Sequence, residues 1–320
     1  MPVYCVTGGT GLIASSLVRE LLSRGHTVRA TVRDPEDAAK VGFLQSMEGA
    51  RERLQLVKAD LLVDGSFDDA VDGADGVFHT ASPVSAAEDE NAQQTLIDVA
   101  IEGTRNVMKS CSKASSVRRV VLTSSISSIR YRYDATVASP LNESHWSDIE
   151  YFKRYKLWYA YSKTLAEKEA WRLAENFGVN LVVVNPSFVV GPIITPQPTS
   201  SLHYILGFLK GHFSECPNRT MGFVHIDDVV FAHILAMEDS RASGRLICSN
   251  SVVHWSEILE MIRANYPSYP VPSKCSDQDE GSKPHSVDTA KIRSLGLPRF
   301  KTLPQMFDDC IKSFQEKGFL

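Results

Sequence analysis

Three side chains in the sequence could together reduce a carbonyl group. Tyr159 and Lys163 are four residues apart in a stretch with helical periodicity, so they share one face of the predicted helix. Ser125 follows the predicted strand 119–123. Hydride transfer to a ketone builds negative charge on oxygen, to which a tyrosine can give a proton and a serine hydroxyl can donate a hydrogen bond. We expect the neighbouring ammonium to lower the tyrosine pKa, which is otherwise about 10. In the alternative interpretation, Tyr159 is only a helix-start aromatic and Ser125 a loop hydroxyl.

A glycine-rich turn, TGGTGLIA at residues 7–14, joins the first predicted strand to the first predicted helix. Gly8 allows the chain to turn tightly, and Gly11 allows a pyrophosphate to approach the helix N-terminus, where free N–H groups and the helix dipole favour an anion. Ala14 is the third small residue, where helix and strand pack closely. A turn without a ligand is the alternative. The glycine-rich turn lies at the first strand–helix junction of an alternating α/β pattern, and this place in the chain favours dinucleotide binding.

The end of the second predicted strand, residues 27–32, indicates which dinucleotide binds. A free ribose 2′-hydroxyl calls for an acidic residue there, whereas a 2′-phosphate calls for positive charge. Arg33 can hold a phosphate with its planar guanidinium, and Lys40 adds a point charge. The sequence therefore favours NADP(H), while Asp34 leaves NAD open and Arg33 could be merely an exposed arginine.

The elements that must position these residues alternate along the first 186 residues. Short β-branched runs without polar alternation are separated by amphipathic stretches, as in a parallel sheet covered on both faces. We predict strands at 3–7, 27–32, 54–58, 76–79, 119–123 and 181–185, and helices at 12–24, 66–71, 93–113 and 158–176. The predicted fold is an α/β, doubly wound, parallel-sheet Rossmann domain that binds its ligand at the strand carboxyl ends.

The sequence changes character after Pro186. Residues 191–201 are rich in Pro, Thr and Ser, which predicts a loop leaving the sheet. We predict three further helices at 202–210, 227–237 and 255–264, and a polar loop at 273–284. The NADP-binding domain is therefore placed at residues 1–190 and a smaller, mostly helical substrate-binding region at 191–320. The elements could interleave, with part of residues 220–250 returning to the sheet.

The composition excludes several classes of protein. The 320 residues include 34 Lys and Arg against 38 Asp and Glu, a net charge of −4, and 43% of them are hydrophobic. This mildly acidic chain offers no basic stripe for nucleic acid, and it can bury a core. No run approaches the roughly 18 apolar residues of a membrane span, and a strand begins almost at Met1, which leaves no room for a signal peptide. We expect a cytoplasmic protein.

The cysteines and histidines predict neither disulfides nor a metal site. The six cysteines are scattered without a CxxC pair, so we expect reduced thiols, and the nine histidines are not clustered at ligand spacing. We expect no metal. His225-Ile226-Asp227-Asp228 resembles an acid/base or metal site, but an aspartate that caps the next helix explains it better.

Beyond these residues, the chain resembles the extended short-chain dehydrogenase/reductases over essentially its whole length. Within them it is similar to the plant group of dihydroflavonol and cinnamoyl-CoA reductases. The resemblance lies in the motifs TGGTGLIAS, TVRD, KADL, GVFHTASPV, LTSS, YSK, NPSFVVGP and FVHIDDVV. Three further motifs, LNESHWSD, SSIRYRYDA and VHWSE, resemble the branch that acts on tetraketide α-pyrones.

The resemblance implies roles that spacing cannot show. Ser125, Tyr159 and Lys163 match the family's catalytic triad, and Arg33 and Lys40 match its contacts to the 2′-phosphate. From the turn and the resemblance together, the residues assigned to the cofactor are Gly8, Thr10, Gly11, Leu12, Ile13, Arg33, Lys40, Asp60, Leu61, Thr80, Ala81, Ser82, Tyr159, Lys163, Pro186, Val189 and Ser201.

Two departures from the group bear on the substrate. Cinnamoyl-CoA reductases typically read NWYCYGK up to the catalytic lysine, whereas this chain reads LWYAYSK at residues 157–163, which disfavours a CoA thioester. Dihydroflavonol reductases usually carry an asparagine five residues after the catalytic serine, and here that residue is Arg130. Arg130 could meet the oxygen-rich edge of a pyrone, or it could form a structural ion pair.

The resemblance therefore implies NADPH-dependent reduction of a ketone on a hydroxyalkyl (tetraketide) α-pyrone to a secondary alcohol, in sporopollenin precursor synthesis. The alternatives are a dihydroflavonol 4-reductase, a hydroxycinnamoyl-CoA reductase and, from another class, a non-catalytic NADPH-sensing protein. Candidate substrate contacts are Ser125, Arg130, Phe188, Ile194, Tyr204 and Phe223, of which the last four could equally be core.

The expected partner is a small-molecule polyketide or phenolic substrate, together with other enzymes of the pathway. We expect a monomer or a homodimer. The predicted helix at 93–113 could serve as a dimer face or simply cover the sheet.

Overall fold

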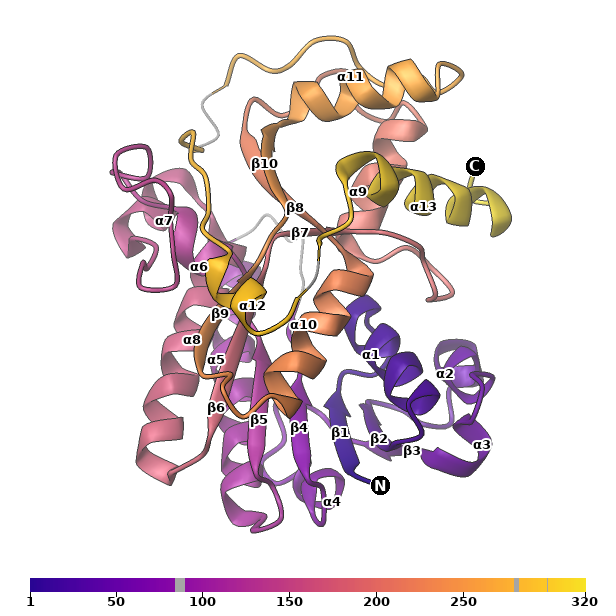
Figure 1. Cartoon of the computed structure of the whole chain (residues 1–320), viewed down its shortest axis with the longest axis vertical. Helices are drawn as coiled ribbons and strands as arrows, with labels where there is room; N and C mark the ends of the chain where they lie inside the picture. The colour runs from indigo at the N-terminus through magenta and orange to yellow at the C-terminus, as the bar shows by residue number, and fades with distance from the viewer. Residues whose placement is uncertain (84–89, 279–281, 298) are drawn as a thin grey trace.

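A seven-stranded parallel sheet forms the centre of the molecule (Figure 1). The computed structural model describes residues 1–83, 90–278, 282–297 and 299–320. The strand order is β3-β2-β1-β4-β5-β6-β9, and each neighbouring pair is parallel. The order of the chain reverses between β1 and β4, where open α/β sheets bind their ligands. The strands are β1 (Val3–Thr7), β2 (Thr27–Val32), β3 (Leu54–Lys58), β4 (Gly76–His79), β5 (Arg119–Thr123), β6 (Leu181–Pro186) and β9 (Gly244–Cys248).

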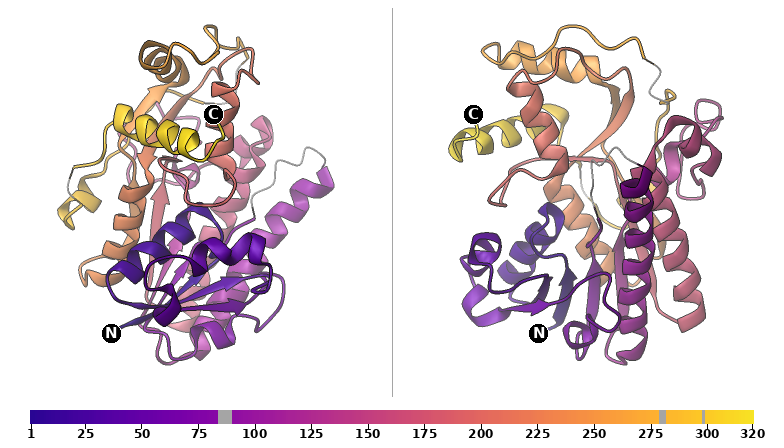
Figure 2. Two further views of the ribbon diagram at one scale, coloured as in Figure 1. Left: turned by 90° about the vertical axis from the view of Figure 1, so that its right-hand side faces the viewer. Right: turned by 180° about the vertical axis from the view of Figure 1, so that it is seen from behind.

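Helices cover both faces of this sheet. α5 (Glu90–Lys113) packs along α8 (Trp158–Phe177) on one face, and α1 (Leu12–Ser23) contacts α10 (Ile226–Glu238) on the other (Figure 2). α8 ends at Gly178, whose φ of 68° provides the left-handed residue that commonly ends a helix. The shorter helices are α2 (Ala38–Gln45), α3 (Ala50–Arg53), α4 (Asp68–Val71), α6 (Ser127–Arg130), α7 (Ile149–Tyr155) and α12 (Ala290–Ser294).

A second, three-stranded sheet lies beyond the carboxyl edge of the first, in the upper half of Figure 1. Its order is β10-β8-β7; β8 is parallel to β7 and antiparallel to β10. Its strands and the long helices around them are β7 (Phe188–Val190), β8 (Thr220–His225), β10 (Ser251–His254), α9 (Ser200–Leu209), α11 (Trp255–Asn265) and α13 (Leu303–Glu316). Side chains at their N-termini start two of these helices: His254 and Thr302 each form a capping box.

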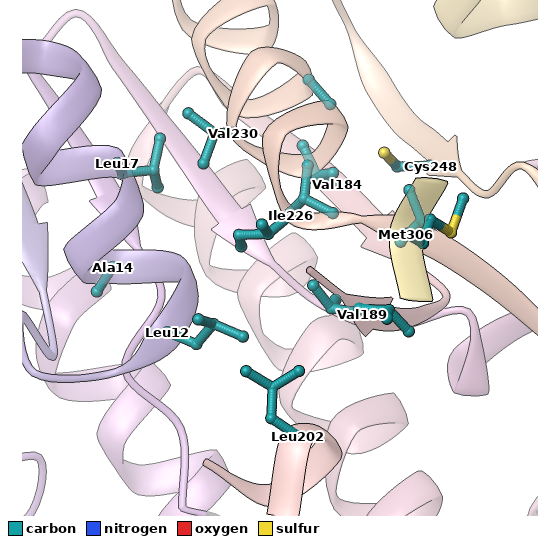
Figure 3. Close-up of a cluster of buried hydrophobic side chains, with 14 of the residues drawn as sticks. Leu12, Ala14, Leu17, Val184, Val189, Leu202, Ile226, Val230, Cys248 and Met306 are labelled. Carbon is teal, nitrogen blue, oxygen red and sulfur yellow. The ribbon is translucent and has the colours of Figure 1, made fainter. Parts of the chain in front are cut away.

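One hydrophobic core joins the two sheets. Figure 3 shows members of this cluster on α1, β6, β7, α9, α10, β9 and α13. Leu12 and Leu17 of α1 belong to the same cluster as Val189 of β7 and Met306 of α13. The helix that follows the glycine-rich turn therefore packs in one core with the C-terminal elements.

The predicted α/β, doubly wound, parallel-sheet fold is confirmed. The six predicted strands are present, and only β6 differs in its bounds, extending to Pro186. The predicted helices at 12–24, 93–113, 158–176, 202–210, 227–237 and 255–264 are present with shifts of up to three residues, and the one at 66–71 shortens to Asp68–Val71. The sequence did not predict the helices α2, α3, α6, α7, α12 and α13 or the bounds of the strands β7 to β10. β9 comes from the C-terminal part of the chain and pairs with β6, so the chain returns to the main sheet there. The division at residue 190 between an NADP-binding domain and a substrate-binding region stays a prediction.

Two sequence-based expectations are wrong. Cys216 and Cys275 form a disulfide, although they are 59 residues apart in sequence. They meet because their segments pair as a short bridge, in which the Cys216 N–H donates to Lys274 O at 2.8 Å. The other four cysteines are free and buried. The cap of α10 is not an aspartate: His225 Nδ1 accepts a hydrogen bond from the Asp227 N–H at 3.0 Å.

Helix hydropathy and the grouping of metal-binding side chains can be read from the described residues. None of the helices in this part of the chain is both long and apolar enough to cross a bilayer. In the same residues, His, Cys, Asp and Glu side chains do not gather in groups of three or more that could hold a metal ion.

Candidate active site

The turn between β1 and α1 requires glycine at two positions. Gly8 has a φ of 72°, and a Cβ there would lie 3.0 Å from Ala81 Cα. A Cβ on Gly9 would lie 3.0 Å from the Cβ of Ala30 on β2. The N–H groups of both glycines donate to Thr31, to its Oγ1 at 3.1 Å and to its carbonyl oxygen at 2.8 Å. The turn is therefore fixed against the ends of β2 and β4.

Gly11 has a different reason to be glycine. Its φ of −76° suits any residue, and a Cβ there would meet only Gly8 O, at an ordinary 3.4 Å, among the described atoms. α1 starts directly after Gly11 without a side-chain cap and without an acidic residue in its first turn. The first N–H groups of the helix and its positive dipole end are thus left for an anion. This cradle fits the pyrophosphate of a dinucleotide.

The ends of β1 and β4 are tied together by Thr7. Its Oγ1 accepts hydrogen bonds from the N–H groups of Thr80 at 3.1 Å and Ala81 at 3.0 Å, and lies 3.0 Å from His79 Nδ1. Because the hydroxyl accepts twice, its proton goes to Nδ1, which places the ring proton on Nε2. Burial and then the Lys163 ammonium lower the pKa of His79 to about 3, so this ring is neutral. Thr80, Ala81 and the half-buried Ser82 are held at the point where the sheet order reverses.

The two cations after β2 differ in their surroundings. Arg33 and Lys40 are both exposed. Lys40 Nζ lies 2.7 Å from Asp37 Oδ2, whereas Arg33 has no carboxylate partner within the described part of the chain. The carboxylate of Asp34 accepts the Glu36 N–H at 3.0 Å, so it is already used in a local turn. Arg33 therefore keeps its guanidinium for a ligand.

The loop after β3 holds Asp60 and Leu61, two of the residues assigned to the cofactor. Asp60 Oδ1 accepts the N–H of Leu62 at 2.9 Å, and Ser66 Oγ bonds to both the N–H and the carbonyl of Asp60, at 3.1 and 2.7 Å. The carbonyl of Leu61 accepts Asn106 Nδ2 of α5 at 2.8 Å. Local hydrogen bonds and α5 thus fix Asp60 and Leu61 in place.

The structure brings the Ser125 and Tyr159 hydroxyls together beyond the end of β5. Ser125 is 8% exposed, and its Oγ accepts the Ser127 N–H at 3.1 Å. Tyr159 lies in the first turn of α8 and is 42% exposed. Its phenol lies close enough to Ser125 for that hydroxyl to lower the phenol pKa. A carbonyl oxygen placed between these groups would have two hydroxyl donors.

The expected lowering of the Tyr159 pKa is wrong for this structure. Desolvation by surrounding protein atoms raises this pKa to about 12, and hydrogen bonding with Ser125 only partly opposes it. Lys163 is not among the groups that shift this pKa; its Nζ donates to the carbonyl of Thr123 at the end of β5, at 2.8 Å. The phenol therefore stays protonated at neutral pH.

Lys163 is buried beside these groups, with 6% of its surface exposed. Burial lowers the pKa of its ammonium to about 8, and the negative charge of Glu167 opposes that shift. Lys163 is therefore a cation at neutral pH that loses its proton in mildly alkaline solution.

Three of the predicted apolar substrate contacts keep some exposed surface, and one is fully buried in the core. Phe188, Ile194 and Tyr204 are half-buried, whereas Phe223 has no exposed surface and belongs to the core, as the sequence left open. Trp255 backs this group, with its ring 5.6 Å from that of Phe188 and 5.5 Å from that of Tyr204. Nearby in sequence, Pro186 and Val189 are buried, and Ser201 at the start of α9 is half-buried.

Arg130 is held by protein oxygens. It is 4% exposed, and NH1 donates to Thr220 O at 3.0 Å and to Ser282 Oγ at 3.4 Å. NH2 donates to the Tyr131 hydroxyl at 2.5 Å. Among the described residues its partners are carbonyl and hydroxyl oxygens and not a carboxylate, so the ion pair that the sequence left open is not formed there.

Three functional candidates were missed from the sequence. Glu167, Asn185 and Arg245 form a buried cluster behind Ser125 and Lys163. Glu167 carried a usable signal, because it lies four residues after Lys163 on the same predicted helix. Arg245 carried none, since only the return of β9 to the sheet brings it close.

Comparison with known proteins gives the family. The model of the NAD dependent epimerase/dehydratase family matches residues 4–247. The chain belongs to this family. It is 63% identical over 321 residues to tetraketide alpha-pyrone reductase 2 of Arabidopsis thaliana, covering 100% of both chains. Among solved structures, it resembles vestitone reductase from alfalfa, with a TM-score of 0.85 and 33% identity over 100% of both chains. It also resembles yeast Gre2 complexed with NADPH, with a TM-score of 0.83 and 25% identity over 99% of this chain and 100% of that one.

The expected membership in the extended short-chain dehydrogenase/reductases is thus confirmed. The chain is an NADP-dependent oxidoreductase with reductase relatives along its full length. The expected cofactor, NADP(H), is also confirmed.

Proposed function

We propose that this chain reduces a ketone on a hydroxyalkyl (tetraketide) α-pyrone to a secondary alcohol, in sporopollenin precursor synthesis. The observation that carries the proposal is the meeting of Ser125, Tyr159 and Lys163 at the sheet edge that also holds the glycine-rich turn. Support for the substrate class comes from the 63% identity with an Arabidopsis protein named for that activity.

The chain's own residues manage the carbonyl oxygen and its proton. When bound, NADPH supplies a hydride to the carbonyl carbon. Ser125 holds the oxygen by a hydrogen bond, and Tyr159 gives it the proton, so that C=O becomes CH–OH. The raised pKa of Tyr159, about 12, keeps the proton on the phenol until the oxygen becomes basic. Lys163, one turn further along α8, supplies positive charge toward the phenolate that remains.

The cofactor is assigned to the turn and to the strand ends beside it. The N–H groups of residues 10–13 would hold the pyrophosphate, and Arg33 would hold the 2′-phosphate. Lys163 would also contact the nicotinamide ribose. Arg33 is the stronger of the two predicted phosphate contacts, because Lys40 is already paired with Asp37.

A long alkyl chain on the substrate needs an apolar wall. Phe188, Ile194 and Tyr204 offer half-buried apolar surface beyond the end of β6, and the buried Trp255 keeps two of these rings in place. Arg130 would meet the pyrone only by giving up part of its bonding to Thr220 and Ser282. The present contacts favour a structural role for its guanidinium.

Two other reductase activities and one non-catalytic role compete with this proposal. A dihydroflavonol or hydroxycinnamoyl-CoA substrate fits less well, because Arg130 and the LWYAYSK segment depart from those groups. A protein that only senses NADPH has no use for a proton donor beside a serine hydroxyl and followed by a buried lysine.

A substrate panel tests the proposal. NADPH oxidation is measured with tetraketide α-pyrones of several chain lengths, with dihydroflavonols and with hydroxycinnamoyl-CoA thioesters. We expect the highest kcat/KM with the pyrones. A higher value with either other class would contradict the substrate, and NADPH binding without turnover on all of them would favour the sensor.

We further propose a cytoplasmic location and a monomer or homodimer, alone or with other enzymes of the pathway. The four free, buried cysteines fit the first statement, whereas the Cys216–Cys275 disulfide is unusual for a cytosolic protein. Sedimentation of the purified protein tests the second, because a higher oligomer would contradict it.

A further inference from the structure

A buried ion pair lies directly behind the candidate triad. Glu167 of α8 is 1% exposed and Arg245 of β9 is 6% exposed, and Arg245 Nε lies 2.6 Å from Glu167 Oε1. The other carboxylate oxygen, Oε2, accepts hydrogen bonds from Ser124 Oγ at 2.5 Å, Ser128 Oγ at 2.6 Å and Asn185 Nδ2 at 3.0 Å. One carboxylate therefore joins the segment after β5 to α6, β6, α8 and β9.

The partners of Glu167 hold the backbone of Ser125. The carbonyl of Ser125 accepts a hydrogen bond from Asn185 Nδ2 at 3.2 Å and lies 2.9 Å from Ser128 Oγ, whose single proton is shared between this carbonyl and the Glu167 carboxylate. Both donors are themselves bonded to Glu167. A shift of the carboxylate would consequently displace the loop that carries the Ser125 hydroxyl.

Arg245 is fixed as firmly as its partner. Its NH1 donates to the carbonyls of Glu143 at 3.1 Å and His145 at 2.5 Å, and its NH2 donates to Ser128 Oγ at 2.7 Å. The Trp146 ring lies 3.9 Å from its guanidinium carbon. With these contacts, the guanidinium cannot turn away without losing several hydrogen bonds.

Stability alone does not explain such a pair. Desolvation of two buried charges offsets much of their attraction, and apolar residues of similar volume often stabilise a core equally well. What the pair does provide is a fixed charge and a fixed geometry. Both are useful one helical turn from Lys163.

We propose that Glu167, held by Arg245, is the positioning residue of this site: it fixes the Ser125 loop and provides the negative charge that faces the Lys163 ammonium. The inference rests on the proposed roles of Ser125, Tyr159 and Lys163. Glu167 itself acts through these groups and transfers no proton to the substrate.

The charged and titratable groups around the pair are few. Tyr159 and Glu167 share α8 with Lys163, and the neutral His79 faces Lys163 from β4. Arg245 of β9 faces Glu167 through Nε and, at 3.4 Å, through NH2, and Lys291 Nζ of α12 donates to the Arg245 carbonyl at 2.9 Å. The other groups that donate to Oε2, from the residue after β5 and from α6 and β6, are uncharged. Removing either member of the pair therefore changes the charge near Lys163 in a known direction.

Variants with opposite charge effects test the inference. Glu167→Gln should lower kcat by about 10- to 100-fold, because the Ser125 loop loses its anchor. It should also move the alkaline limb of the kcat–pH profile to lower pH, since the ammonium loses its negative neighbour. Arg245→Met leaves the carboxylate uncompensated and should move that limb to higher pH. Ser128→Ala removes the hydrogen bonds of one hydroxyl but no charge, so it should lower kcat without moving the limb.

Controls separate this inference from a simple loss of folding. Glu169→Gln on the same helix breaks surface pairs with Arg105 and Arg172 and should change neither kcat nor the profile. Thermal unfolding and NADPH binding are measured for each variant; if Glu167→Gln does not fold, Arg245→Met and Ser128→Ala carry the test. The inference would be overturned if the alkaline limb of the kcat–pH profile did not move, or if it moved in the same direction for Glu167→Gln and Arg245→Met. If Tyr159→Phe keeps the full rate, the proposed function fails instead.

Discussion

The two sides of the candidate site are built from different parts of the chain. The cofactor side depends on a short contiguous turn, in which Gly8 and Gly9 are held against β2 and β4 and the first N–H groups of α1 are left free. The substrate side depends on rings from separate elements, with Phe188 on β7, Tyr204 on α9 and Trp255 on α11. The first is local backbone geometry, and the second is long-range packing.

This difference predicts two kinds of mutational effect. Changes on the cofactor side should alter NADPH binding while leaving the free energy of unfolding nearly unchanged, because Arg33 and Lys40 are exposed. Changes to the aromatic group should lower that free energy first, because Trp255 and Phe223 are fully buried. Tyr159 and Lys163 lie between the two sides.

Tyr159→Phe should give the largest effect. Loss of a positioned proton donor lowers rates by about 10²- to 10⁴-fold, and the removed hydroxyl has no structural partner beyond Ser125 among the contacts described above. Steady-state kinetics should show the loss in kcat, while the Kd for NADPH, measured by nicotinamide fluorescence, stays within about twofold. A variant that keeps its full rate would refute the proton-donor assignment.

Trp255→Ala should be the most destabilising change on the substrate side. The ring is fully buried and contacts Phe188, Tyr204 and Phe208 with centroid distances of 5.4 to 5.6 Å. We expect the free energy of unfolding in urea to fall by about 3–5 kcal/mol. Phe177→Ala, at a 44% exposed position, is the matched control and should cost less than about 0.5 kcal/mol. Equal effects of the two changes would remove the distinction between the sides.

Arg33→Ser should change cofactor preference without changing stability. Hydrogen bonds to charged groups contribute about 1.5–3 kcal/mol, so the ratio of kcat/KM for NADPH over NADH should fall about 10- to 100-fold. Parallel assays with the two cofactors measure this ratio. An unchanged ratio would show that another group holds the 2′-phosphate.

Lys40→Ala should have the smallest effect. Its ammonium is exposed and already lies 2.7 Å from Asp37, and exposed pairs of this kind contribute about 0.2–1 kcal/mol. We expect the same NADPH/NADH ratio to change by less than about fivefold. A loss as large as that of Arg33→Ser would mean that Lys40 leaves Asp37 when the cofactor binds.

The same contrast explains how much the sequence could predict. The main strands and the turn were found because each depends on hydrophobic patterning and glycine spacing within a few residues. The sequence left open that part of residues 220–250 returns to the sheet, but it did not locate β9 or Arg245, since a strand that returns after β8 has no local signal for its place. The disulfide was missed for the same reason, with 59 residues between its cysteines. The direction of the Tyr159 pKa was wrong because spacing shows Lys163 nearby but does not show how strongly the surrounding protein desolvates the phenol.

Transfer of a labelled hydride tests the central claim most directly. The wild-type protein is incubated with NADPH that carries deuterium at C4 of the nicotinamide and with a ketone-bearing hydroxyalkyl α-pyrone, and the product is analysed by mass spectrometry. We expect a secondary alcohol with deuterium on the carbinol carbon, formed by the wild type and lost with Tyr159→Phe. Cofactor binding without any labelled alcohol, from any pyrone of the panel, would contradict it.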